Sequence, residues 1–376
     1  MIYLDSAATT MQKPPSVSRA CVSAMRTMAS PGRGGHRPAM LAARTAFACR
    51  EEAAALFGVN EPENVVFTFN ATHGLNIAIK SLVKRGDTVL ISGYEHNAVT
   101  RPLHALGAVV KVAYGPLFQP EAMFRSFEEQ LTPEVCAVVC NHVSNVFGYI
   151  LPVERIAALC RARGVPFILD ASQSAGCLPV DMSQLKAAFI AMPGHKGLYG
   201  PQGTGLLLCG TDTQPLLEGG TGSMSARQEM PDFLPDRLEA GTHNIPGIAG
   251  LLEGIRYVRR EGPLKILERE RRLMQTAAKG LSALPEITVY ADPQGSAQAG
   301  VLSFQVGEMD CELVGEALGK CGIAVRAGLH CSPLAHRSAG TYEKGTVRSS
   351  FSSFNSRLEA ERLVWEIGHL NRKNSR

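Results

Sequence analysis

The alternation of short apolar runs with helical segments between about residues 50 and 210 constrains the fold more than any other feature of the chain. The apolar runs are expected strands because each is short and rich in Val, Ile, Leu or Phe. They lie at residues 63–69, 87–92, 135–144, 165–170, 187–192 and 206–209. Helices are expected at 70–86 and 152–164, the second with Pro near its start and Gly at its end. Strands that alternate with helices make right-handed crossovers, so the sequence predicts an α/β fold with a mostly parallel sheet wrapped by helices.

Beyond about residue 245 the pattern changes. Long amphipathic helical stretches come first, and shorter strands follow, at 248–262, 263–284, 287–291 and 301–306. A chain of 376 residues is long enough to form two hydrophobic cores. We therefore expect a large domain at 13–250 and a smaller C-terminal α+β domain at 251–376, with the N-terminal segment 1–12 belonging to the small domain.

Composition excludes several classes of protein. With 45% hydrophobic and 19% charged residues and a net charge of +4, the chain is typical of an ordinary globular protein. No cluster of basic residues indicates a nucleic-acid partner. No stretch approaches the ~20 apolar residues that span a bilayer, and the start MIYLDSAATT does not look like a leader. We expect a cytoplasmic protein with neither a nucleic-acid nor a membrane partner.

The ten cysteines are scattered, without a CxxC pair or a Cys/His spacing typical of zinc sites. Cys136 and Cys140 lie in an apolar run, where small buried thiols are common. We expect reduced cysteines and no metal site.

Ligands of open parallel sheets bind beyond the carboxyl ends of the strands, so polar residues at those ends are the candidate site. Asp170 closes the apolar run VPFILD and needs a partner there. It could be a helix cap or part of a structural ion pair, or it could keep a pyridinium nitrogen protonated, as pyridoxal 5′-phosphate (PLP) requires. Lys196 lies in PGHKG, where neighbouring glycines let a large ligand approach the backbone. It could be a surface lysine, or a shielded lysine of lowered pKa that forms a Schiff base.

Two further strand ends carry polar residues. Thr72, with the backbone amides near His73 and Gly74, is expected to open a helix, either as a simple cap or as a phosphate site. His96 follows the run DTVLIS and could be structural, or could stack on a flat heteroaromatic cofactor. The order of these four sets along the chain is more specific than any one of them.

The chain resembles the class V aminotransferase family of fold-type I PLP enzymes, and within it the cysteine desulfurases and selenocysteine lyases. The resemblance extends over nearly the whole chain. It rests on YLDSAATT from Tyr3, the GRGGH run ending at His36, FTFNATHGLN, YEHNAVTRP, HVSNVFGYILPV, ILDASQSAG, GHKGLYGPQGTG, EAGTHN, VRAGLHC and VRSSFSSFN. The family fold implies a large domain with a mostly parallel, seven-stranded type of sheet and a smaller α+β domain.

The resemblance also implies a PLP site. Lys196 looks like the lysine that carries the cofactor, and Asp170 like the partner of its pyridine nitrogen. Gln173 and Asn145 look like residues near its phenolic oxygen, and His96 like the histidine that stacks on its ring.

The cofactor's phosphate has its own expected ligands. Thr72 and His195 resemble phosphate ligands, with His73 in the same helix opening. Thr242, in EAGTHN, resembles a threonine that reaches the phosphate of the neighbouring subunit, so a homodimer is implied.

Substrate binding is expected at four residues. Arg348 looks like the arginine that grips the substrate α-carboxylate, which a guanidinium can do with two hydrogen bonds. Asn145 is expected near the same carboxylate, and Arg326 and His36 fall where the family has further active-site residues.

Cys331 is the residue that distinguishes among the reactions of the family. Its position in RAGLHC is similar to that of the cysteine that takes up sulfur as a persulfide in the desulfurase subgroup. Lys196, Cys331 and His96 are thus the expected catalytic residues. The chain departs from the family pattern at five positions, which are Ala71, Pro193, Gly197, Leu329 and Ser332.

The resulting hypothesis is a PLP-dependent cysteine desulfurase, a sulfurtransferase that converts L-cysteine to L-alanine and passes the sulfur to Cys331 and then to an acceptor protein. A selenocysteine lyase, a cysteine sulfinate desulfinase and a PLP enzyme acting on another amino acid stay open. So does a protein that binds PLP or relays sulfur without turnover.

Overall fold

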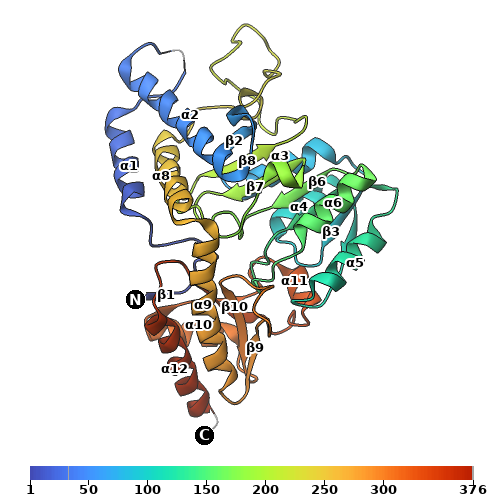
Figure 1. Cartoon of the computed structure of the whole chain (residues 1–376), viewed down its shortest axis with the longest axis vertical. Helices are drawn as coiled ribbons and strands as arrows, with labels where there is room; N and C mark the ends of the chain where they lie inside the picture. The colour runs from blue at the N-terminus through green and yellow to red at the C-terminus, as the bar shows by residue number, and fades with distance from the viewer. Residues whose placement is uncertain (33, 375–376) are drawn as a thin grey trace.

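The computed structural model of the protein describes residues 1–32 and 34–374. A seven-stranded sheet lies in its upper half, with helices on both faces, and a smaller sheet lies below it (Figure 1). Across the large sheet the strands are β2 (Val65–Thr68), β8 (Gly205–Cys209), β7 (Phe189–Pro193), β6 (Phe167–Asp170), β5 (Val135–Asn141), β3 (Thr88–Ser92) and β4 (Val109–Ala113). Strand β8 runs opposite to the other six strands, which share one direction, so the predicted mostly parallel sheet is confirmed.

The central strands of this sheet are buried on both faces, as in α/β proteins generally. Because side chains alternate along a strand, Leu90, Val138 and Leu169 pack into one apolar cluster and their neighbours Val89 and Val139 into another. The first cluster includes residues of α2 (Arg37–Phe57), α5 (Pro120–Gln130), α6 (Val153–Arg163) and α8 (Ile245–Glu261). The second includes residues of α3 (Ala71–Leu82) and α4 (Asn97–Leu106).

The sequence explains where several of these helices start and stop. Helix α6 follows Pro152 and ends at Gly164, whose φ of 66° is the left-handed conformation that glycine adopts without steric cost. Helix α3 is shorter than expected and ends at Leu82. The short helix α7 (Met182–Leu185) begins at Asp181, whose carboxylate accepts from the Gln184 N–H. Helix α1 (Pro15–Thr27) packs against α8.

The smaller sheet is antiparallel, in the order β12 (Arg326–Gly328), β13 (Thr346–Ser350), β10 (Val301–Val306) and β9 (Ile287–Tyr290). Its apolar face packs against α9 (Pro263–Ser282), α10 (Cys311–Lys320) and α12 (Arg357–Asn374). The short helix α11 (Pro333–Ser338) follows Cys331.

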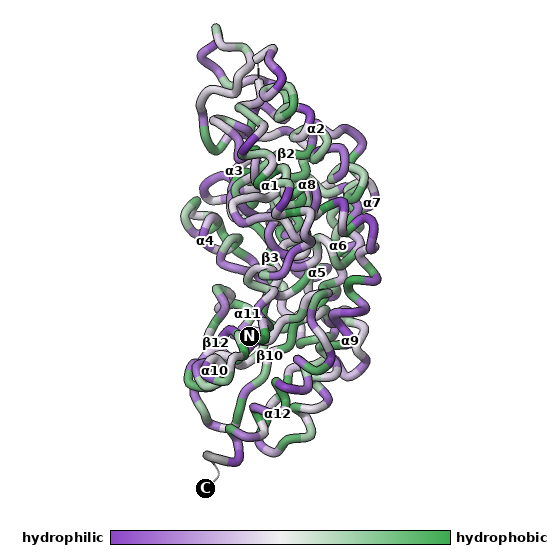
Figure 2. The backbone as a smooth tube through the Cα atoms, turned by 90° about the vertical axis from the view of Figure 1, so that its left-hand side faces the viewer, coloured by the Kyte–Doolittle hydropathy of each residue, from purple (hydrophilic) through white to green (hydrophobic). Residues whose placement is uncertain are grey.

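The N-terminal segment lies beside the smaller sheet, which both views of the molecule show (Figures 1 and 2). Strand β1 (Ile2–Tyr3) pairs in parallel with β11 (Ile323–Ala324), and Asp5 bridges to Ser350 at the end of β13. The predicted boundary between residues 250 and 251 falls inside α8. The division into two domains stays a prediction.

The expected fold class is confirmed, although strand β4 was not among the predicted strands. The first two residues of its run VVKVA, Val109 and Val110, are exposed, because β4 lies at the edge of the sheet. Within the described part of the chain, none of the helices combines the length and the hydropathy that crossing a bilayer requires.

Candidate active site

A cavity opens beyond the carboxyl ends of β5, β6 and β7. Asn141 and Asp170 are the last residues of β5 and β6, and they are paired in the sheet register. Lys196 follows the end of β7 by three residues. The lining residues come from these strand ends and from the first turns of α3 and α4: Asn70, Ala71, Thr72, His96, Ala98, Asn141, Val143, Asn145, Asp170, Ser172, Gln173, Pro193, His195 and Lys196. Seven of the expected site residues therefore line one cavity, namely Thr72, His96, Asn145, Asp170, Gln173, His195 and Lys196.

The loop that carries Lys196 is fixed by the N-terminal segment. The His195 carbonyl accepts from the Thr10 N–H at 3.1 Å and from the Thr10 hydroxyl at 3.0 Å. The His195 ring lies 3.0 Å from the Thr9 hydroxyl through Nδ1. Burial lowers the pKa of Lys196 to about 8, against the opposing effect of the Asp170 carboxylate. Burial and the nearby Lys196 lower the pKa of His195 to about 4. Lys196 is thus far closer to a neutral amine at pH 7 than an ordinary lysine.

Asp170 is 4% exposed, and its Oδ1 accepts from the Ser172 N–H at 2.9 Å. A second buried carboxyl group, that of Glu95, is close enough to interact with it electrostatically. Glu95 Oε1 accepts from the Ser92 hydroxyl at 2.5 Å and from the Asn141 N–H at 2.7 Å. Burial raises the pKa of Glu95 to about 8, and the charge of Asp170 adds to this. At neutral pH Glu95 is therefore mostly protonated.

The first turn of α3 borders the cavity. Asn70, rather than Thr72, caps this helix, because its Oδ1 accepts from the His73 N–H at 2.9 Å. The Thr72 side chain is exposed and available to a ligand. The N–H groups of the first helical turn have no partner within the helix and attract anions. Ala71 and Pro193 contribute no hydroxyl group to this edge of the cavity.

His96 and Gln173 are both tied to the backbone. His96 caps α4, where its Nδ1 accepts from the Ala98 N–H at 3.0 Å. Burial lowers the pKa of His96, which favours the neutral ring. The Gln173 side chain donates to the Ala7 carbonyl at 2.9 Å, a second tie to the N-terminal segment. His96 thus caps a helix and also lines the cavity.

Six expected residues are not among those that line this cavity. Arg326, Arg348 and Cys331 lie in two groups described below, and the other three are His73, Thr242 and His36. His73 and Thr242 line a neighbouring cavity on the other side of the first turn of α3. The segment before Thr242 is anchored by the buried Glu239, which accepts from the Phe67 N–H at 2.7 Å and pairs with Arg50 at 2.6 Å. His36 is exposed and caps α2. The structure brings none of His73, Thr242 and His36 into the cavity of Lys196 within one chain.

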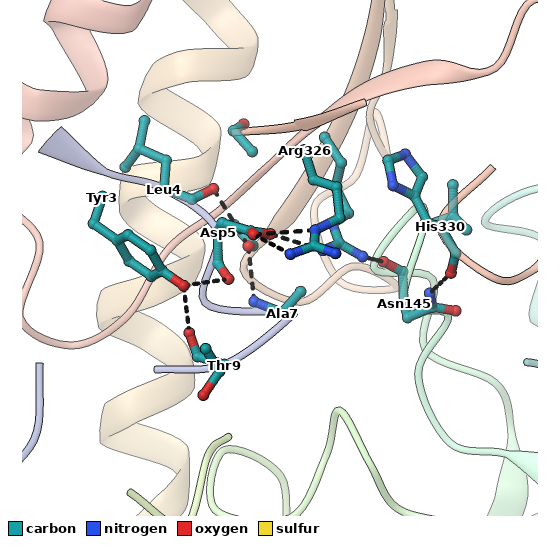
Figure 3. Close-up of polar contacts among 12 residues, drawn as sticks. Tyr3, Leu4, Asp5, Ala7, Thr9, Asn145, Arg326 and His330 are labelled. Carbon is teal, nitrogen blue, oxygen red and sulfur yellow. Dashed lines mark hydrogen bonds and ion pairs between the residues drawn. The ribbon is translucent and has the colours of Figure 1, made fainter. Parts of the chain in front are cut away.

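Arg326 and Arg348 are joined by one carboxylate, that of Asp5. Figure 3 shows Arg326 beside Asp5. Arg348 donates from one terminal nitrogen to Asp5 Oδ1 at 2.9 Å and from the other to the Asn145 carbonyl at 2.8 Å. Arg326 donates from Nε at 3.1 Å and from a terminal nitrogen at 2.9 Å to Asp5 Oδ2. Arg348 is 2% exposed, and its Nε has no hydrogen-bond partner among the described residues. One donor of this buried guanidinium is therefore left without a partner.

The Cys331 loop is held by the side-chain amide of Asn145. Its Nδ2 donates to the His330 carbonyl at 2.9 Å, and its Oδ1 accepts from the Ser332 hydroxyl at 2.6 Å. Cys331 is exposed between these two buried neighbours, and its carbonyl accepts from the Asn97 N–H at 2.8 Å. His330 and Cys331 have φ values of 50° and 57°, which side-chain-bearing residues rarely adopt. The amide of Asn145 thus holds a strained loop and also lines the cavity.

Sequence reasoning missed the roles of Asp5 and Glu95. Both lie inside motifs that carry the family resemblance, YLDSAATT and YEHNAV, so the motifs were the available signal. Ser332 was noted only as a departure from the family pattern, and its hydrogen bond to Asn145 depends on the folded loop.

The model of the aminotransferase class-V family matches residues 2–363, and the chain belongs to this family. A probable cysteine desulfurase of Methanothermobacter thermautotrophicus is 33% identical over 96% of this chain and 92% of that protein. A cysteine desulfurase of Escherichia coli is 33% identical over 99% of this chain and 94% of that protein.

A solved structure agrees with these sequence comparisons. The apo structure of the cysteine desulfurase from Thermococcus onnurineus superposes with a TM-score of 0.89 at 31% identity, covering 99% of this chain and 95% of that one. The expected family is confirmed, and so is the expected fold.

Proposed function

We propose that this protein is a PLP-dependent cysteine desulfurase that converts L-cysteine to L-alanine and takes up the sulfur on Cys331. The observation that carries the proposal is the single cavity lined by both Asp170 and Lys196, in which burial lowers the pKa of the lysine to about 8. The names of the full-length relatives support the same reaction.

The residues present fit PLP. An amine of lowered pKa is a competent nucleophile toward an aldehyde, and Lys196 would hold the cofactor through it. Asp170 would pair with the pyridine nitrogen, His96 would lie on the ring, and the α3 N-terminus with Thr72 would hold the phosphate. When bound, PLP supplies an electron sink for a carbanion at the substrate's Cα.

Arg348 would bind and orient the substrate. Its buried guanidinium keeps a free Nε donor, and Asn145 and Asp5 fix its plane. Charge-assisted hydrogen bonds of this kind hold a carboxylate strongly. The Lys196 amine, once released by the incoming amino acid, would take the Cα proton as a general base.

Cys331 would accept the sulfur. Its thiolate attacks the substrate's sulfur, the Cβ–S bond breaks, and the bonding pair stays with the carbon, which is protonated to the methyl group of alanine. The products are alanine and a persulfide on Cys331, which an acceptor protein would collect. The exposure of Cys331 supports access by such an acceptor.

A homodimer remains part of the proposal. Thr242 lies in a cavity separate from that of Lys196, and its side chain is exposed. This placement is compatible with a threonine that serves the site of a second copy.

The test is to incubate the PLP-loaded protein with L-cysteine and quantify alanine and the mass of one added sulfur atom on the Cys331 peptide. Lys196→Ala should abolish the visible absorbance of lysine-bound PLP and all alanine release. Cys331→Ser should abolish the persulfide and sulfide release, whereas Cys321→Ser, at the other exposed cysteine, should leave both intact. Wild-type protein that binds PLP and releases no alanine would overturn the proposal in favour of a non-turnover role. Selenocysteine turnover that survives Cys331→Ser would favour a lyase.

A further inference from the structure

The Asp5–Arg326–Arg348 cluster combines two guanidinium groups with one carboxylate. Each carboxylate oxygen of Asp5 accepts from a different arginine, so neither oxygen lacks a hydrogen-bond partner. The cluster carries one net positive charge, because two cations share one anion. Asp5 and Arg348 are buried, at 7% and 2% exposure, which limits screening of their interaction by solvent.

The two arginines occupy different places relative to the cavity. Arg348 contacts Asn145, which lines the cavity. Arg326 is half exposed and is close enough to Cys331 for the two side chains to interact electrostatically. In the proposed function, an amino acid whose carboxylate is held by Arg348 and whose sulfur meets Cys331 would bring its side chain close to Arg326.

We propose that Asp5 sets the substrate class by neutralising Arg326, so that the site accepts amino acids with a single carboxylate and an uncharged side chain. The inference rests on the proposed function and deepens it. A thiol is mostly uncharged at neutral pH. A side-chain sulfinate or carboxylate is anionic. It would approach an Arg326 guanidinium whose positive charge is already balanced by Asp5, and the negative charge of Asp5 would repel it. Asp5 acts through the arginines and is a positioning residue.

The test alters this charge balance in both directions. Asp5→Asn leaves the two arginines without their anion, and Arg326→Gln leaves Arg348 alone with Asp5. Lys344→Gln is the matched control, because Lys344 is also about half exposed and paired with one carboxylate, that of Glu308. Calorimetry on the PLP-loaded proteins gives dissociation constants for L-alanine, with one carboxylate, and L-aspartate, with a second one.

We expect Asp5→Asn to shift binding toward L-aspartate relative to L-alanine by at least about fivefold, the effect of one unit charge at about 4 Å in water. Arg326→Gln should shift the ratio the opposite way, and Lys344→Gln should leave it unchanged. Steady-state assays should show the same ordering in KM for cysteine sulfinate against cysteine, with smaller changes in kcat.

The outcomes separate the two proposals. If wild-type protein releases alanine from cysteine and yet the binding ratio is equal in all variants, the inference about Asp5 is wrong and the desulfurase stands. If wild-type protein releases no alanine, the proposed function fails, whatever the binding ratios. Should Asp5→Asn fail to fold with Arg348 left unpaired, the Arg326→Gln ratio alone decides, because that side chain is half exposed.

Discussion

Two buried carboxylates organise the candidate site, and they reach it by different routes. Asp170 ends β6 and Lys196 follows the adjacent strand β7, so the register of one sheet brings them together. Asp5 meets Arg326 and Arg348 from 321 and 343 residues away, through a segment tied down by β1 and by single hydrogen bonds. The topology of the sheet brings reactive side chains together at one edge, whereas the arginine cluster depends on separate long-range contacts.

The largest effect is expected on kcat, and it should distinguish the role of Asp170 from that of Asp5. Asp170→Asn is expected to lower kcat for every amino acid substrate by about a hundredfold, a loss typical of one missing electrostatic partner at a reacting group. Asp5→Asn should act mainly on KM and on substrate preference. Steady-state kinetics with matched PLP content, checked by visible absorbance, measures both. A normal kcat in Asp170→Asn would remove the distinction.

This contrast also marks how far the sequence could predict the site. Asp170, Lys196, His96 and Thr72 were recognisable because each follows an apolar run, and the carboxyl ends of parallel strands meet at one edge. The same reasoning anticipated the sheet, with β4 missed because its exposed valines lie at the edge.

What escaped prediction lies in contacts without periodicity. The pairing of Asp5 with two distant arginines follows from β1 joining β11, and no local pattern near residue 5 encodes that partner. The hydrogen bond from Ser332 to Asn145 likewise depends on the folded loop, in which His330 and Cys331 both have left-handed backbone conformations. Motif resemblance pointed to both regions, and only the folded chain shows what joins them.

An intermediate effect is expected when PLP is added back to the PLP-free protein. Because burial lowers the pKa of Lys196 to about 8, the neutral amine fraction rises about fivefold between pH 7 and pH 8. The rate of visible-absorbance gain should rise by the same factor and level off above pH 9. Arg326→Gln should move the midpoint upward, since the Arg326 cation lowers this pKa. An unchanged midpoint would mean that the two charge clusters act independently.

The smallest effect should appear at the Cys331 loop. Ser332→Ala removes one hydrogen bond to Asn145, a contribution of about 0.6 kcal/mol, so alkylation of Cys331 by iodoacetamide should become about threefold faster. Peptide mass spectrometry over time measures the rate at this residue.

The control for Ser332→Ala is Ser349→Ala. Ser349 is also fully buried, and its hydroxyl donates to the Leu302 carbonyl at 3.4 Å. That change should leave the alkylation rate of Cys331 as it is in the wild type. Equal rates in both variants would show that the amide of Asn145 does not restrain the loop.

The pairing of β1 with β11 sets an order of events during translation. Residues near the start of the chain emerge from the ribosome first, yet their partners at residues 323–324 and 346–350 emerge near the end. Domains tend to fold as they are synthesised, and contacts between distant residues form late. A nascent chain arrested before residue 323 has every strand of the large sheet, and still cannot assemble the guanidinium cluster that would receive an amino acid.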